Sequence, residues 1–251
     1  MLMRRLKALY FWPMAFLVTV ALFLAVLCRQ ALVVVLGRPR DGRPIHRIAS
    51  LWGRALVSLT PGWHVDVEGQ EHLPPTEPGS PPLVIVANHE SMADIWAMYY
   101  LGIQFRWLSK IEVFRVPLVG PAMRWANYVP IRRGDPDSHG RAMEQSAERL
   151  REGLPMFFFP EGTRSPDGHI QDFKLGAFKL ARDHHARILP IAIRGAGGLL
   201  PKGSLLPSQR AQVRLRILPM QPAPGPTDDL EQVAHRSREL IVTAHAELAG
   251  R

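Results

Sequence analysis

Two short segments of the chain carry residue types that suit proton transfer beside a bound anion. Residues 88–94 read NHESMAD, in which His89 can act as a general base and Asp94 can orient its imidazole. Residues 159–165 read FPEGTRS, a glycine-containing turn flanked by a carboxylate and a guanidinium, which suits a phosphorylated alcohol. Because the chain also begins with an apolar, basic segment, these features predict chemistry on a phospholipid at a membrane surface.

His89 and Asp94 are five residues apart, which on an ideal helix separates them by about 140°. The pair can meet if His89 lies in a turn between a strand and a helix, with Ser91 as N-cap and Asp94 at the third helical position. The Asp94 carboxylate then accepts Nδ1–H and leaves Nε2 free as the base. The same Ser-x-x-Asp spacing is also an ordinary capping pattern that needs no catalysis. Ser91 as a nucleophile is disfavoured, because the chain contains no Gly-x-Ser-x-Gly elbow.

The second segment provides several groups that can hold an anion. Gly162 lets the backbone approach a ligand closely, and the Thr163 hydroxyl can donate a hydrogen bond. Arg164 can grip a phosphate with two N–H groups, while Glu161 can hold a glycerol hydroxyl or orient Arg164. The alternative is a surface turn with a weak Glu–Arg pair. The turn lacks the Gly-x4-Gly-Lys form of a nucleotide phosphate loop, so ATP chemistry is not indicated.

Alternating strand and helix patterns predict an α/β fold: a largely buried central sheet of about seven strands flanked by helices. Residues 83–87 are a continuous apolar run of strand length, which is typical of a buried strand. The other strands are expected at 64–68, 105–108, 128–131, 156–159, 188–193 and 213–217. Helices are expected at about 91–101, 117–126, 138–152, 174–184 and 228–248.

Length, charge and cysteine content narrow the classes of protein to which the chain can belong. The 251 residues allow one sizeable domain and an appendage, and the single cysteine, Cys28, excludes an intrachain disulfide and a cysteine-based metal cluster. We expect no metal site, because the remaining histidines are scattered. Most of the net charge of +9 lies in residues 1–47, with eight Arg or Lys and one acidic residue. This charge brackets an apolar run, which favours anionic lipid headgroups over nucleic acid as the partner.

As a helix, the apolar run Leu9–Leu27 would be about 28 Å long, which is close to the hydrocarbon thickness of a bilayer. A cleaved signal peptide is disfavoured by this length and by the lack of a small-x-small site before Arg29. The helix either spans the bilayer or lies in one leaflet. If it spans, the heavier basic flank on its C-terminal side keeps the following domain cytoplasmic. We therefore expect a membrane-associated helical segment at 1–60 and a catalytic domain at 61–251, on the cytoplasmic face of the membrane.

Residues 44–59 have apolar side chains at helical spacing opposite a basic face. Such a helix can lie among lipid headgroups, or its apolar stripe can pack on the core of the domain. The pattern alone does not separate these two interpretations.

Taken together, the segments resemble the 1-acylglycerol-3-phosphate O-acyltransferase family, and the resemblance covers about residues 65–220. Four blocks occur in the family's order. They are Asn88-His89-x4-Asp94; Lys110-x-Glu112 with Pro117-x-x-Gly120 and Ile131-Arg132-Arg133; the FPEGTRS segment with Phe173-Lys174-x-Gly176; and Leu189-Pro190-Ile191. The second block often ends in Ile-Asp-Arg, so Arg132 replaces an acid and Arg133 is the better match for a phosphate-binding arginine.

The resemblance implies a reaction and a role for each residue. His89 would deprotonate the free glycerol hydroxyl while Asp94 fixes its tautomer, and Glu161 would position the glycerol. Arg133 and Arg164, with Lys110 as a further candidate, would hold the phosphate. The acceptor would be 1-acylglycerol-3-phosphate (lysophosphatidate), the product phosphatidate, and the acyl donor acyl-CoA or acyl-carrier protein, with no cofactor. Alternatives are transfer to another lyso-lipid, such as lyso-ornithine lipid or a lysophospholipid, a lipid hydrolase, and a non-catalytic lipid-binding protein.

Overall fold

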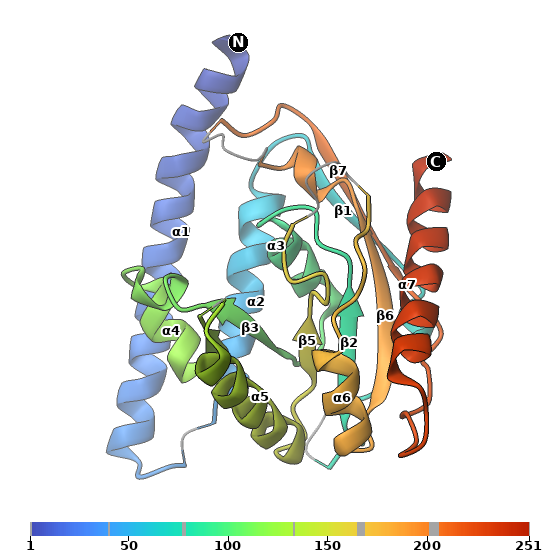
Figure 1. Ribbon diagram of the computed structural model, residues 1–251. Helices are drawn as coiled ribbons and strands as arrows, with labels where there is room; N and C mark the ends of the chain where they lie inside the picture. The colour runs from blue at the N-terminus through green and yellow to red at the C-terminus, as the bar shows by residue number, and fades with distance from the viewer. Residues whose placement is uncertain are drawn as a thin grey trace.

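A single mixed sheet of seven strands lies at the centre of the molecule (Figure 1). The computed structural model describes residues 2–39, 41–76, 79–132, 134–164, 169–200 and 206–250. The strand order is β1-β7-β6-β2-β5-β3-β4. Strands β2 to β6 run parallel to one another, β7 is antiparallel to β6, and β1 is parallel to β7. The strands are β1 Trp63–Glu68, β2 Leu83–Ala87, β3 Arg106–Lys110, β4 Val129–Ile131, β5 Met156–Phe158, β6 Arg187–Arg194 and β7 Ala211–Ile217. The predicted α/β class and all seven strand positions are confirmed.

Strand β2 is central because its apolar side chains face cores on both sides of the sheet. All five of its residues are buried. Leu83, Ile85 and Ala87 belong to the hydrophobic cluster shared with α2 and α3, whereas Val84 and Val86 belong to the cluster shared with α6 and α7. A strand that is covered on both faces has no polar alternation, which explains the uninterrupted apolar run in the sequence.

Helices form a layer on each face of the sheet. Helices α1 to α4 pack on one face and α5 to α7 on the other. They are α1 Leu2–Val35, α2 Arg43–Ser58, α3 Asp94–Met98, α4 Val119–Trp125, α5 Pro136–Arg151, α6 Gly176–Asp183 and α7 Leu230–Glu247. Helix α3 is shorter than expected: residues 91–93 form a turn, and a 3-10 turn at Tyr99–Leu101 leads to Gly102 at φ +73°.

Helix α1 is longer than the apolar run that predicted it, and both its halves are attached to the rest of the molecule. Near its start, Arg4 donates to the carbonyl of Leu206, and Lys7 donates to the carbonyls of Pro61 and Gln209. Further along, Phe23 stacks on Trp125 of α4 at 6.2 Å. Helix α1 therefore lies along the domain. Among the described residues it alone is long and apolar enough to cross a membrane.

Helix α2 packs most of its apolar stripe on the domain core. Ile45, Leu56 and Val57 are buried, while Leu51 and Leu59 face outward. Of the two interpretations of this stripe, packing on the domain core explains why Ile45, Leu56 and Val57 are buried. Side chains of α1 and α2 share one hydrophobic cluster with the strands, and a domain boundary at residue 60 stays a prediction.

Candidate active site

The predicted functional residues gather at the carboxyl ends of neighbouring parallel strands. His89 follows β2, Glu161 follows β5 and Lys110 ends β3, and these three strands lie side by side. Lys110 is paired in register with Ile131, so Arg132 begins the loop next to it. Arg133 lies outside the described residues. The carboxyl ends of parallel strands are where open α/β sheets place their sites, and here the strands bring separate sequence segments to one place.

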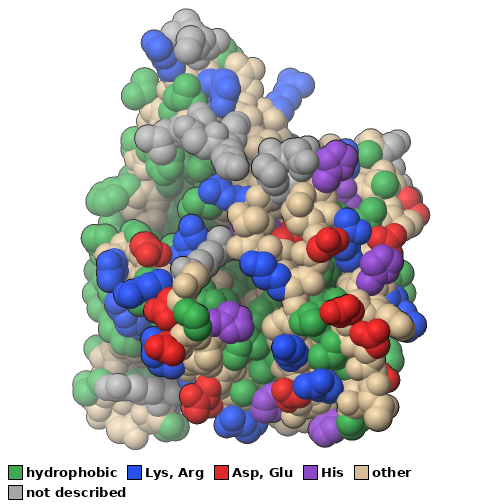
Figure 2. Space-filling model, in the orientation of Figure 1, with side chains coloured by type: hydrophobic (Ala, Val, Ile, Leu, Met, Phe, Trp, Pro, Cys, Tyr) green, Lys and Arg blue, Asp and Glu red, His purple; other side chains and the backbone are tan. Residues whose placement is uncertain are grey.

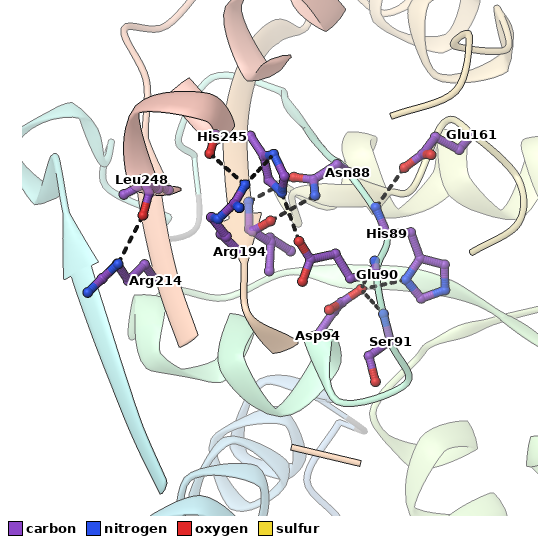
Figure 3. Close-up of polar contacts among 11 residues, drawn as sticks. Asn88, His89, Glu90, Ser91, Asp94, Glu161, Arg194, Arg214, His245 and Leu248 are labelled. Carbon is purple, nitrogen blue, oxygen red and sulfur yellow. Dashed lines mark hydrogen bonds and ion pairs between the residues drawn. The ribbon is translucent and has the colours of Figure 1, made fainter. Parts of the chain in front are cut away.

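His89 and Asp94 form the base–carboxylate pair that their spacing suggests. The Nδ1 atom of His89 lies 2.6 Å from Oδ2 of Asp94 (Figure 3). The Asp94 side chain is fully buried and His89 is nearly so. Because Nδ1–H donates to the carboxylate, Nε2 carries the free lone pair and can accept a proton.

The turn before α3 brings Asp94 back toward His89. Oδ2 of Asp94 also accepts hydrogen bonds from the backbone N–H groups of Glu90, at 2.8 Å, and Ser91, at 3.0 Å. Ser91 was expected to be the N-cap, but α3 begins after Ala93, and the Ser91 hydroxyl accepts from the Ala93 amide. Asp94 therefore closes the turn and orients the imidazole with the same oxygen. The Ser-x-x-Asp spacing can thus serve the local fold and a base–carboxylate pair at once.

Burial raises the pKa of Asp94 above its ordinary value, whereas its hydrogen bond to His89 and its interaction with the imidazole charge act in the opposite direction. An ionised carboxylate at this depth is stabilised by the N–H groups around it. The imidazolium formed when His89 takes a proton has its countercharge already in contact.

Two neighbours of the pair were not singled out from the sequence. The ring of Phe159 stacks on His89 with centroids 4.0 Å apart and planes at 18°. The Asn88 side chain bonds to both the carbonyl and the amide of Ile193 on β6, each at 2.8 Å. Phe159 thus fixes the plane of the imidazole, and Asn88 fixes the strand end from which it projects. Both residues lie within the two sequence motifs, as the first residue of each, but the motifs alone gave neither a role.

Glu161 connects the two halves of the site through backbone groups. Its Oε1 accepts from the His89 amide at 2.7 Å, and its Oε2 accepts from the Gln171 amide at 3.0 Å. Burial raises the pKa of Glu161, and the amides of Gln171 and His89 partly offset this effect. The carboxylate therefore holds the loop that carries the base. Its predicted contact with a glycerol hydroxyl stays a prediction.

The turn after Glu161 leaves cationic groups available for an anion. Gly162 adopts φ +72°, which favours glycine, and the Nζ atom of Lys174 would lie 2.7 Å from a Cβ at this position. Thr163 and Lys110 are exposed and Arg164 is half-buried. Within the described ranges, the side chains of Arg164 and Lys110 form no hydrogen bond or ion pair. In that part of the chain, neither cation has an internal partner to give up when it pairs with a ligand.

Comparisons with known proteins agree with this geometry. A model of the family described as Acyltransferase matches residues 64–194, a range that includes the base, its carboxylate and the FPEGTR turn. The 1-acyl-sn-glycerol-3-phosphate acyltransferase of Chlamydomonas reinhardtii is 32% identical over 97% of this chain and 70% of its own length. The human 1-acyl-sn-glycerol-3-phosphate acyltransferase alpha is 31% identical over 97% of this chain and 83% of its own length. The chain belongs to the 1-acyl-sn-glycerol-3-phosphate acyltransferase family.

The fold of this acyltransferase also matches a solved structure of a family member. The crystal structure of the 1-acyl-sn-glycerophosphate acyltransferase PlsC from Thermotoga maritima aligns with a TM-score of 0.81 and 27% identity, covering 99% of this chain and 97% of the other. Because the alignment covers 99% of this chain, it includes most of helix α1 as well as the sheet domain. The chain is therefore an acyltransferase.

Proposed function

We propose that the chain transfers a fatty acyl group from an acyl thioester to the sn-2 hydroxyl of 1-acylglycerol-3-phosphate, giving phosphatidate. The observation that carries this proposal is the 2.6 Å hydrogen bond between His89 Nδ1 and Asp94 Oδ2, beside a turn whose Arg164 has no ionic partner among the described residues. A base oriented by a carboxylate suits deprotonation of an alcohol. The nearby cations suit an acceptor that carries a phosphate.

In the proposed reaction, Nε2 of His89 takes the hydroxyl proton as the acceptor oxygen attacks the thioester carbonyl. A carbon–oxygen bond forms, the carbon–sulfur bond breaks, and the leaving thiolate takes the proton from the His89 imidazolium, which restores the neutral base. Asp94 stabilises the imidazolium during the attack. No cofactor takes part, and the donor is acyl-CoA or acyl-carrier protein.

Transfer is direct and forms no acyl-enzyme. The hydroxyl of Ser91 bonds to the carbonyl of Leu200 and accepts from the Ala93 amide, and no hydrogen bond joins it to His89 among the described residues. A serine nucleophile needs its base within hydrogen-bond reach. This arrangement supports acyl transfer to an external alcohol over hydrolysis through Ser91.

The acceptor phosphate is held by Arg164, Arg133 and Lys110, and Glu161 positions the glycerol. The approach of the phosphate to the turn relies on Gly162, and Thr163 donates a hydrogen bond. Arg132 stands where an acid is common in the family and adds a positive charge close to Lys110. This extra charge favours an acceptor with a compact anionic headgroup.

The acyltransferase is proposed to work at a membrane, with its catalytic domain on the cytoplasmic face. Large apolar side chains are exposed along α1, among them Leu9, Phe16 and Leu17, and hydrophobic side chains gather along that side of the surface (Figure 2). Exposed apolar patches of this extent mark membrane or protein contacts. Because α1 is attached to the domain in both halves, we propose that it lies in one leaflet rather than crossing the bilayer.

The test is a panel of lyso-lipids offered with labelled acyl-CoA or labelled acyl-carrier protein. Wild type and His89→Ala are assayed in parallel, and circular dichroism checks that the variant is folded. We expect labelled phosphatidate from lysophosphatidate and loss of turnover in His89→Ala by roughly a thousandfold or more.

Each alternative gives a different result in this panel. Preferred labelling of lyso-ornithine lipid or of a lysophospholipid would reassign the acceptor. Release of free fatty acid without an acceptor would indicate a hydrolase. Turnover that is unchanged in folded His89→Ala would remove the base from the mechanism.

A further inference from the structure

Glu90, the residue after the proposed base, is attached to the last helix of the chain. Its side chain turns away from His89, and its Oε1 accepts from Nε2 of His245 on α7 at 2.8 Å (Figure 3). The two residues are 155 positions apart. Both side chains are largely buried, at 20% and 14% exposure, so solvent screens this contact weakly. The backbone amide of the same Glu90 donates to Asp94.

The neighbours of His245 indicate its tautomer. Nη1 of Arg194 lies 3.2 Å from both Nδ1 and the carbonyl oxygen of His245. Because a guanidinium only donates, Nδ1 must accept, and the ring proton is on Nε2, where it points at Glu90. The imidazole of His245 therefore joins the guanidinium of Arg194 to the carboxylate of Glu90. Such a charge-assisted chain is directional and holds Glu90 in one position.

Helix α7 also contacts the other half of the site. Arg238 donates to the carbonyls of Ile170, at 2.7 Å, and Gln171, at 3.2 Å. The amide of Gln171 in turn donates to Glu161, the carboxylate that holds the His89 backbone. Arg238 and His245 are seven residues apart, which is about two helical turns, so they lie on the same side of α7. One helix thus contacts both loops that support the base.

We propose that α7 is a positioning element for the acid–base pair, with His245 holding the loop of His89 and Asp94 through Glu90, and Arg238 holding the segment that supports Glu161. Loss of either contact frees a segment whose amides fix Asp94 or Glu161. Because general-base transfer depends on near-attack geometry, a displacement of about 1 Å costs up to a hundredfold in rate. This consequence for rate rests on the proposed function, whereas the consequence for loop protection does not.

The test compares variants of α7 with matched controls on the same helix. His245→Ala and Arg238→Ala remove the two contacts, and His235→Ala and Arg236→Ala remove exposed side chains of the same types. We expect kcat to fall tenfold or more in the first two, with KM for the acceptor within about threefold. The controls keep the wild-type kcat. Glu90→Gln, which retains an oxygen acceptor, keeps most of the kcat that Glu90→Ala loses.

Coupling and hydrogen exchange separate positioning from a general effect on stability. The double variant Glu90→Ala/His245→Ala is expected to lose no more than the larger single loss, because both substitutions break one contact. Amide exchange at Glu90 and Ser91 accelerates at least tenfold in His245→Ala, and exchange at Gln171 does so in Arg238→Ala.

Several results would overturn the proposal: multiplicative losses in the double variant, unchanged exchange at these amides, or kcat losses that the two controls share. If wild type turned over no lyso-lipid, the proposed function would fail, and the exchange measurement would still decide whether α7 holds the loops.

Discussion

Three N–H groups converge on one oxygen of Asp94: the imidazole of His89 and the backbone amides of Glu90 and Ser91. This arrangement couples the fold of a five-residue turn to the orientation of the base. It also places a negative charge in a fully buried position, where burial raises the pKa of the carboxyl. In the proposed reaction, Asp94 thus serves catalysis at a cost to the stability of the folded chain.

Asp94→Asn should therefore separate activity from stability. The neutral amide cannot stabilise an imidazolium, so kcat should fall by roughly 10³- to 10⁴-fold. Since a buried charge is removed, the thermal midpoint at neutral pH should stay the same or rise. Steady-state kinetics and thermal unfolding in detergent measure the two effects, and Asp137→Asn, an exposed substitution, is the control. A large fall in the midpoint with kcat intact would contradict the assigned role.

Glu161 gives a prediction about pH. Its pKa in the folded chain is raised above the ordinary value of 4.5, so the folded state binds the proton more tightly than the unfolded state. The stability that this group contributes is fully present below pH 4.5 and is lost as the pH rises through the folded pKa. Thermal midpoints of wild type and Glu161→Gln, measured from pH 4 to pH 7, should show the advantage of wild type over the variant shrinking as pH rises. A constant difference would contradict this.

At the scale of elements, close packing of α2 against the end of α3 supports the turn that carries His89 and Asp94. Gly53 of α2 faces the ring of Tyr99, which follows α3, and a Cβ on Gly53 would lie 2.3 Å from a ring carbon. The glycine thus permits α2 to approach the end of α3 more closely than any other residue would. Packing density, rather than helix propensity, explains why a glycine is placed inside this helix.

A pair of glycine substitutions tests this explanation. Gly53→Ala should destabilise the chain by about 1–3 kcal/mol, because the ring of Tyr99 is held in the core and cannot move aside. Gly140→Ala, in the exposed interior of α5 with no atom within 4 Å of the added Cβ, should stabilise by about 0.5–1 kcal/mol. Denaturant unfolding measures both. The two substitutions are expected to change the free energy of unfolding in opposite directions. A stabilising Gly53→Ala would refute the close approach of α2 to Tyr99.

At the scale of the whole molecule, α1 lies beside the sheet domain and exposes most of its large side chains. Phe11 and Val26 are buried against the domain, whereas Leu9, Phe16 and Leu17 are each more than 60% exposed. The helix thus presents one side to the core and the other outward. This arrangement suits a helix that contacts lipid along its length while staying fixed to the catalytic domain.

The outward side of α1 should control binding to vesicles. Each large apolar side chain contributes about 1.5–3 kcal/mol when fully buried. Replacing Leu9, Phe16 and Leu17 with serine should therefore weaken binding to anionic vesicles by about a hundredfold or more, measured by flotation. Turnover of a short-chain, soluble lyso-lipid should stay within about twofold of wild type. Leu240→Ser, an exposed position on α7, is the control, and equal losses in both variants would refute an α1-specific surface.

Local patterns in the sequence predict much of this architecture. The features that they do not predict are contacts between segments that are far apart in the sequence. The apolar run at 83–87 predicts β2, because a strand covered on both faces must be apolar throughout. The spacing of His89 and Asp94 allows their contact only if a turn lies between strand and helix, and the structure has that turn. No local pattern predicts the bond between Glu90 and His245, or the antiparallel pairing of β7 with β6, because each depends on segments that meet only in the folded chain.

The single cysteine of the chain, Cys28, lies exposed on α1, beyond the aromatic side chains at the start of that helix. A thiol-reactive nitroxide or fluorophore would therefore attach at one known position without any substitution. Collision quenching by oxygen, compared with quenching by a water-soluble nickel chelate, then reads the immersion depth of the label directly. The wild-type protein thus carries its own reporter of how α1 sits relative to lipid.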